Sequence, residues 1–84
     1  MQIEAISETP NQNTIKITLS EKRSDNKSDT YTHAADGQPE FINRLFDIEG
    51  VTSIFYVMDF ISVDKENDKD WDELIPKIQE KFNA

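Results

Sequence analysis

The sequence predicts a two-layer α+β domain with the element order β-β-α-β-β-α, in which two helices cover one face of a mainly antiparallel sheet. The chain contains two pairs of short runs typical of β-strands, and a segment with helical spacing follows each pair. The 84 residues leave room for one small core, so we expect a single domain over residues 1–84.

The composition of the chain argues against several classes of function. The formal net charge is −8, and in the sequence Lys and Arg gather into no stripe, so neither nucleic acid nor an anionic membrane is an expected partner. The chain has no cysteine, which excludes disulfides and thiolate metal sites within it. We see no secretory leader and no apolar run of about 18–20 residues. We therefore expect a cytoplasmic monomer, and its acidic surface favours basic partners.

The first two strands are expected to form an antiparallel hairpin. Residues 2–7 read as a short strand with Ile3 and Ala5 on one face. The segment "TIKITLS" (residues 14–20) alternates apolar and polar side chains, as a half-buried strand does. Between them, "TPNQN" (residues 9–13) has the composition that a tight turn requires, because proline presets φ and asparagine tolerates positive φ.

A polar segment follows the hairpin. Residues 20–29, "SEKRSDNKSD", contain no apolar residue and predict a mobile loop. The run "TYTHA" (residues 30–34) is a candidate third strand, which would place His33 at a sheet edge. His33 is the only histidine, and no neighbour in the sequence is placed to orient it for acid–base chemistry.

The best-marked helix is predicted over residues 36–50, "DGQPEFINRLFDIEG". Pro39 suits its first turn, Glu40 complements the helix dipole, and Gly50 is placed to end it. Its apolar side chains are expected on one buried face: Phe41, Ile42, Leu45, Phe46 and Ile48.

Two more strands are expected at residues 52–57 and 60–64, on either side of Met58 and Asp59. A two-residue hairpin turn prefers Asn-Gly or Asp-Gly, so either the loop is longer or local strain is tolerated. Departures from local rules tend to lie at functional places, which makes Met58, Asp59 and Phe60 candidate contact residues. The alternative is that Phe60 belongs to the core and Asp59 caps the turn through its own backbone.

The last element is a helix that Asn67 or Asp68 can cap, with acidic residues in its first turn. Its apolar residues fall on one face at helical spacing: Trp71, Leu74, Ile75, Ile78 and Phe82. Pro76 lies inside this pattern and cannot donate a backbone hydrogen bond. We therefore expect a bend or a split helix there.

Carboxylates recur from Asp64 to Glu73, a spacing that raises the question of a calcium site. An EF-hand loop requires glycine at its sixth position and glutamate at its twelfth. Counted from Asp64, these positions hold Lys69 and Ile75, so the motif fails. A solvated loop that runs into a helix N-terminus explains the acids more simply. With only two glycines there is no Gly-rich phosphate loop, and we expect no enzyme.

Several blocks together resemble the N-terminal domain of Nfu/NifU-type iron–sulfur cluster scaffold proteins. The resemblance covers nearly the whole chain. It rests on "ETPNQNTIKI", "LFDIEGV" and "DFISVDKEN", with Trp71 just beyond, and residues 20–33 fit least well. It implies the same β-β-α-β-β-α fold. In longer family members this domain precedes a second one, whose Cys-x-x-Cys pair holds the cluster.

The resemblance implies a non-catalytic accessory module that assists iron–sulfur cluster assembly or delivery through protein contacts. Because the chain has no cysteine, the cluster ligands correspond to no residue here, and we expect no cofactor. The expected partner is a cysteine-bearing scaffold domain, a cluster donor or an apo client. The alternative is a small-ligand or divalent-metal-binding domain outside cluster assembly. The candidate partner-binding residues are Thr9, Asn11, Asn13, Met58, Asp59 and Phe60.

Overall fold

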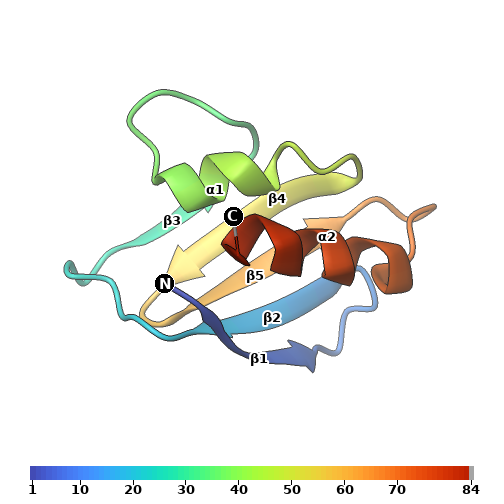
Figure 1. Cartoon of the computed structure of the whole chain (residues 1–84), viewed down its shortest axis with the longest axis horizontal. Helices are drawn as coiled ribbons and strands as arrows, with labels where there is room; N and C mark the ends of the chain where they lie inside the picture. Colours follow the sequence, from blue (N-terminus) through green and yellow to red (C-terminus); the bar gives the residue numbers. More distant parts are fainter. Residues whose placement is uncertain (84) are drawn as a thin grey trace.

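The computed structural model, which describes residues 1–83, has a five-stranded antiparallel sheet in the order β1-β2-β5-β4-β3. Both helices lie against the same face of this sheet (Figure 1). The predicted fold class is therefore confirmed. The elements are β1 (Ile3–Glu8), β2 (Thr14–Leu19), β3 (Ser28–Tyr31), α1 (Glu40–Leu45), β4 (Val51–Val57), β5 (Phe60–Lys65) and α2 (Trp71–Asn83).

The core lies between the sheet and the helices. The three inner strands β2, β5 and β4 each direct alternate side chains toward α1 and α2, because successive strand residues point to opposite faces. None of the described residues with a buried side chain is polar or charged. The core consists of Ile15, Ile17, Leu19, Ile42, Leu45, Ile48, Ile54, Tyr56, Ile61, Val63, Leu74 and Ile78.

Strand β1 contains a bulge that overturns one prediction. Ile3 pairs with Leu19, but Ala5 pairs with Thr18, so the register shifts between Ile3 and Ala5. The extra residue flips the alternation: Ile3 and Ile6 are half-buried against the core, whereas Ala5 is exposed. The prediction that Ile3 and Ala5 share a face is wrong.

The third strand exists but begins earlier than predicted. β3 spans Ser28–Tyr31 and pairs with β4, with Ser28 opposite Val57. The chain then leaves the sheet because the Asn43 side chain bonds both the N–H and the C=O of Ala35, at 3.2 and 3.0 Å. The edge-strand placement of His33 is therefore wrong: His33 is exposed in a bend beyond β3.

Helix α1 is shorter than the predicted residues 36–50. Pro39, with ψ at 138°, is its N-cap, and α-helical bonding ends at Leu45. Hydrogen bonds from residue i to residue i+3 continue as far as Val51, whose N–H donates to Ile48 at 3.3 Å. The prediction that Gly50 ends the segment fits its φ of +105°. Of the five predicted apolar side chains, Ile42, Leu45 and Ile48 are fully buried and the two phenylalanines are half-buried.

Helix α2 runs without interruption from Trp71 to Asn83, so the split at Pro76 is not observed. Pro76 is exposed at the sixth of the thirteen positions of α2, and the helix continues past it. The cap is also not at Asn67 or Asp68. Asp70 takes this role, since its carboxylate accepts the Asp72 N–H at 3.1 Å and its carbonyl accepts the next helical N–H groups.

Neither helix combines the length and the apolar character needed to cross a membrane, within residues 1–83.

Candidate protein-binding surfaces

The six predicted contact residues form two separate groups. Three lie in the β1–β2 turn and three at the β4–β5 turn. Strands β2 and β5 are antiparallel neighbours, so these turns stand at opposite ends of the pair, about 20 Å apart along six strand residues. The two groups are Thr9, Asn11 and Asn13 at one end, and Met58, Asp59 and Phe60 at the other.

The β1–β2 turn is held by its own side chains. The Thr9 hydroxyl lies 2.9 Å from the Asn11 carbonyl and 2.8 Å from the Thr14 carbonyl, and it accepts the Asn11 N–H at 3.2 Å. The Asn11 side-chain oxygen accepts the Asn13 N–H at 2.9 Å. Side chains that bond the backbone two residues away stabilise tight turns. These polar groups therefore have a structural role, and a partner contact there stays a prediction.

Two of the family-like blocks and Trp71 meet beside this turn. Asn13 donates from its side chain to Asn67 and accepts Lys65 Nζ at 3.0 Å. The Lys65 amine also lies 5.7 Å from the centre of the Trp71 ring. The indole N–H of Trp71 donates to the Gln12 carbonyl at 3.0 Å. These contacts tie the first turn to the loop before α2.

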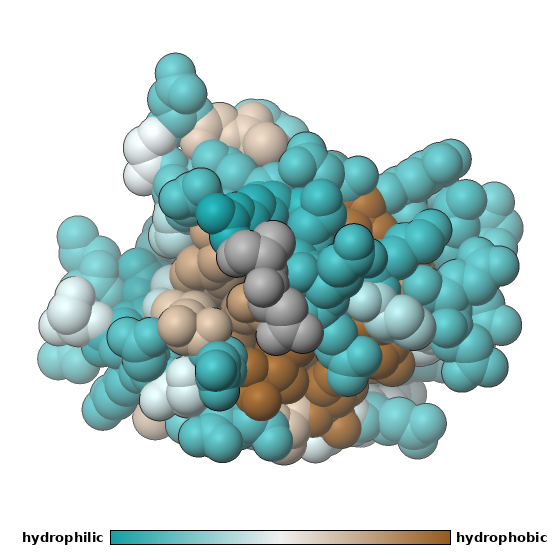
Figure 2. Space-filling model, in the orientation of Figure 1, coloured by the Kyte–Doolittle hydropathy of each residue, from teal (hydrophilic) through white to brown (hydrophobic). Residues whose placement is uncertain are grey.

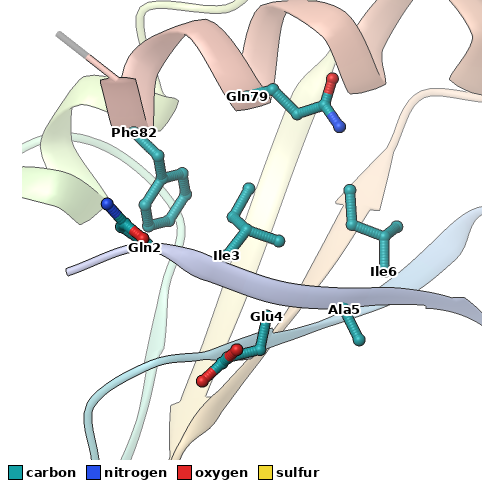
Figure 3. Close-up of a pocket in the computed structure, with 7 residues that line it drawn as sticks. All are labelled: Gln2, Ile3, Glu4, Ala5, Ile6, Gln79 and Phe82. Atoms are coloured by element: carbon teal, nitrogen blue, oxygen red, sulfur yellow. The ribbon is translucent and has the colours of Figure 1, made fainter.

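A groove of about 560 Å³ runs between the edge strand β1 and helix α2. Figure 2 shows hydrophobic side chains below α2 on an otherwise largely hydrophilic face. In Figure 3, Ile3 and Ile6 point toward α2, where Gln79 and Phe82 lie, whereas Glu4 points away. The periodicity of residues 2–7 does not reveal this groove, because the bulge in β1 changes which side chains point toward α2.

The β4–β5 turn has two residues and is strained. Val57 pairs with Phe60, which leaves Met58 and Asp59 as the loop. Met58 has a φ of +54°, a value that non-glycine residues rarely adopt. The second of the two predicted options, tolerated strain, is confirmed. Two backbone bonds hold the turn: Met58 accepts the Arg23 N–H at 2.9 Å, and Asp59 accepts the Leu19 N–H at 2.6 Å.

Beside this turn, four apolar side chains form what we call the sheet patch. They are Phe55, Val57, Met58 and Phe60. All four lie outside the buried core and outside the ring of residues packed against it, so the alternative that Phe60 belongs to the core is wrong. Phe55 and Met58 expose 38% and 55% of their surface.

The sheet patch departs from the composition of the face on which it lies. This face is opposite the helices, and on its inner strands it otherwise carries mostly Thr, Ser, Lys and Asp side chains, as a solvated sheet face does. Val57 stands directly opposite Phe60, and Phe55 is opposite Ser62 and so diagonal to Phe60. Phe55 and Val57 are not among the predicted contact residues, because the run "IFYV" does not reveal which of its members face the core.

The carboxylates between Asp64 and Glu73 do not converge. Asp64 accepts the hydroxyls of Thr14 at 2.5 Å and Ser53 at 2.7 Å, and so joins three strands. Asp70 caps α2. Residues 1–83 contain no group of three or more His, Asp or Glu side chains placed to hold a metal ion. No observation favours the divalent-metal alternative.

Arg23 anchors the segment before β3. Its side chain is only 9% exposed, and it forms ion pairs with Asp25 at 2.8 Å and Asp29 at 2.9 Å. Its guanidinium also donates to the Tyr56 carbonyl at 3.0 Å and lies 4.5 Å from the Tyr56 ring. The hydrogen bond from Arg23 holds the pKa of Asp25 below its ordinary value. The polar segment is therefore fixed to the sheet at one point.

Fold and surfaces together define a small α+β domain with exposed apolar surfaces. The family model described as "Scaffold protein Nfu/NifU N terminal" matches residues 3–84. The chain belongs to this family, and the resemblance first read from its sequence blocks is confirmed.

Similar proteins come from staphylococci. "Conserved virulence factor C" of Staphylococcus saprophyticus is 55% identical over 93% of this chain, and its counterpart in Staphylococcus haemolyticus is 52% identical over 99%. The chain spans about a fifth of the length of these relatives, 21% and 22%. None of the relatives compared is named as an enzyme.

Two solved structures extend the comparison. The crystal structure of protein SAV1430 from Staphylococcus aureus is 61% identical, with a TM-score of 0.95, over 98% of this chain and 99% of that one. The solution structure of SeR13 from Staphylococcus epidermidis is 65% identical, with a TM-score of 0.76, over 99% and 96%. The match over nearly the full length of both chains extends to the whole two-layer fold.

Proposed function

We propose that this protein is a non-catalytic interaction module that assists iron–sulfur cluster assembly or delivery. Membership of the Nfu/NifU N-terminal family supports a role in iron–sulfur cluster assembly. Iron–sulfur clusters are held mainly by cysteine thiolates, and this sequence contains none. In this proposal the cluster stays on a partner that has cysteines, and the module supplies protein contacts.

The observation that carries the proposal is the sheet patch. Exposed apolar side chains gathered on one surface mark places where proteins dock. This patch contains Met58 and Phe60 from the predicted set, and the exposed Asp59 lies in the same turn. The β1–β2 turn is a weaker candidate, since its polar groups are already bonded internally.

The test is an NMR titration of the labelled protein with a cluster-loaded domain that contains a Cys-x-x-Cys pair, at low salt and at about 0.15 M salt. We expect localised amide shifts around residues 55–60. Substituting Phe60 should weaken binding and leave the fold intact. An absence of shifts with the cluster-loaded and the cluster-free domain alike would remove the cluster-assembly proposal.

Two surface variants, each also checked by urea unfolding, separate a surface effect from a folding effect. Phe55→Ser removes exposed apolar surface from the sheet patch, and Pro76→Ala removes it from helix α2 on the opposite side of the sheet. We expect the first variant to weaken the complex and the second to bind as the unmodified protein does. If both variants lose the same binding affinity, the partner does not dock on the sheet patch. The cytoplasmic location and monomeric state expected from the sequence stay predictions.

A further inference from the structure

Three lysines surround the sheet patch although the protein is strongly acidic overall. Lys16 Nζ lies 4.6 Å from the centre of the Phe60 ring. Lys22 and Lys27 line a hollow of about 320 Å³ together with Val57 and Met58. The three lysines lie on β2 and in the segment that follows it, and the antiparallel pairing of β2 with β5 and the return of residues 20–27 bring them to the sheet patch.

These lysines are balanced only in part within the fold, since Asp25 lines the same hollow as Lys22 and Lys27, and Lys27 contributes, after Arg23, to the lowered pKa of Asp25. None of them forms an ion pair with a carboxylate among residues 1–83, whereas Arg23, Lys69 and Lys81 do. Of the nearby acids, Asp25 and Asp29 share the single charge of Arg23, and Glu21 pairs with the N-terminal amine at 3.0 Å. Asp59 is the acid of this region, among the described residues, that has no ion-pair partner.

We infer that the sheet patch binds an acidic protein segment that carries apolar side chains. The apolar side chains would cover Phe55 and Met58, and flanking carboxylates would pair with the three lysines. The local positive charge therefore favours an acidic partner, whereas the net charge of −8 favours a basic one. The inference rests on the proposed function only in treating the protein as an interaction module.

The apolar and charged parts reinforce each other. An ion pair on an open surface contributes little, because water and salt screen it. When an apolar side chain covers the patch, it displaces water beside the lysines and strengthens their attraction for carboxylates. Binding should therefore require both features in the same segment.

Short peptides test this directly because a net-negative protein repels an acidic peptide everywhere except at a local basic site. The first probe has a central pair of leucines flanked on both sides by glutamates. The second replaces the leucines with serines, and the third replaces the glutamates with lysines. NMR titration of the labelled protein reports where each peptide binds.

We expect the leucine–glutamate peptide to shift amides of residues 55–60 and of the lysine-bearing segments. The serine peptide should bind at least about fivefold more weakly. The lysine peptide should shift acidic segments outside the patch. If the leucine–glutamate peptide causes no shifts, or causes them at the β1–α2 groove, the inference is wrong.

Charge variants supply matched controls. Lys16→Glu with Lys27→Glu should weaken the leucine–glutamate peptide about fivefold or more, and Asp59→Asn should strengthen its binding. Lys77→Glu makes the same kind of charge change on α2, where Lys77 is exposed and forms no ion pair with residues 1–83. It should leave binding nearly unchanged. Because the double variant changes the net charge twice as much as Lys77→Glu, a loss of binding free energy in Lys77→Glu that is half that of the double variant or more would reduce the effect to net charge and overturn the inference.

The two proposals fail in different ways. If the peptide binds the patch but the Cys-x-x-Cys domain does not bind at all, the site stands and its role lies outside cluster assembly. If the domain binds at another surface, the proposed function stands and the patch is not its docking site.

Discussion

At the scale of single residues, Met58 shows how a fold can keep a residue in an unfavourable backbone conformation. A left-handed backbone conformation is unfavourable for a residue with a Cβ, by about 1–2 kcal/mol. The two turn carbonyls are fixed by bonds to Leu19 and Arg23, and these bonds hold the loop at two residues. Methionine at this position exposes a long apolar side chain at the tip of a hairpin.

Met58→Gly should therefore stabilise the fold. Glycine adopts positive φ without strain but loses more backbone entropy on folding, so we expect a net gain of about 0.5 kcal/mol. Urea unfolding measures it. Asp59→Gly is the control: the φ of Asp59 is not positive, so the same change there should destabilise the protein. If both substitutions destabilise, strain at Met58 is not what decides the stability of this turn.

The two tyrosines make the protein sensitive to alkali. Burial raises the pKa of Tyr56 above its ordinary value near 10, and Arg23 opposes part of this shift. Burial, with Asp29 nearby, likewise raises the pKa of Tyr31. Both rings thus favour the neutral phenol in the folded state.

Because the folded pKa values are raised, the stabilisation by the neutral phenols is complete below pH 10 and is lost as pH rises above it. Phenolate absorbance should appear at a higher pH in the folded protein than in urea. These are the only tyrosines, so the signal reports them alone. Coincident titration curves in the two states would contradict the burial effect.

At the scale of elements, Gly50 sets the connection between α1 and β4. Its φ is +105°, and a Cβ at this position would lie 2.7 Å from Cγ of Lys69. Its carbonyl accepts the Glu66 N–H at 2.9 Å, which ties this turn to the loop before α2. Two constraints, backbone angle and side-chain space, therefore act on one residue.

Gly50→Ala should destabilise the fold by about 2 kcal/mol and Gly37→Ala by about 1 kcal/mol. Gly37 has a similar φ of +88° but open space around it, so the difference isolates the contact with Lys69. Chemical denaturation of both variants measures this. In a Lys69→Ala background the two costs should converge. If they remain different there, the contact is not the cause.

At the scale of the whole molecule, charge is unevenly distributed. A net charge of −8 on 84 residues opposes compaction by self-repulsion. Three lysines that form no ion pair among residues 1–83 nevertheless lie around the sheet patch, and several acids are used in caps and ion pairs. The average charge therefore describes the long-range field of the protein, and the local arrangement describes its contact surface.

Salt should stabilise this protein modestly. Screening weakens the repulsion among exposed acids, so we expect the thermal midpoint to rise by about 2–4 °C from low salt to about 0.15 M sodium chloride. Circular dichroism melts measure it, with sucrose at matched osmolality as the control for excluded-volume effects. A midpoint that falls over this range would mean that attractive ion pairs outweigh the repulsion.

The end of α1, the cap of α2 and the bounds of β3 differ from those predicted from the sequence. The 3.6-residue spacing of residues 41–48 was read as one helix, but the last turns tighten into i to i+3 bonds with nearly the same spacing of side chains. The cap of α2 shifted to Asp70 because several acids precede the helix and any of them could cap it. β3 was misplaced because pairing with β4, which is distant in sequence, fixes its ends.

The sequence by itself determined the element order, the fold class and the core of the inner strands, because periodic burial is a local property of the chain. It also located both turns and the family. Tertiary structure alone decided that the six candidate residues form two surfaces and that Phe55 and Val57 share a face with Phe60. It also decided that Lys16, beside Phe60, and Lys22 and Lys27, beside Met58, border the same patch. These facts depend on strand register and on long-range pairing, which bring together residues that no local pattern connects.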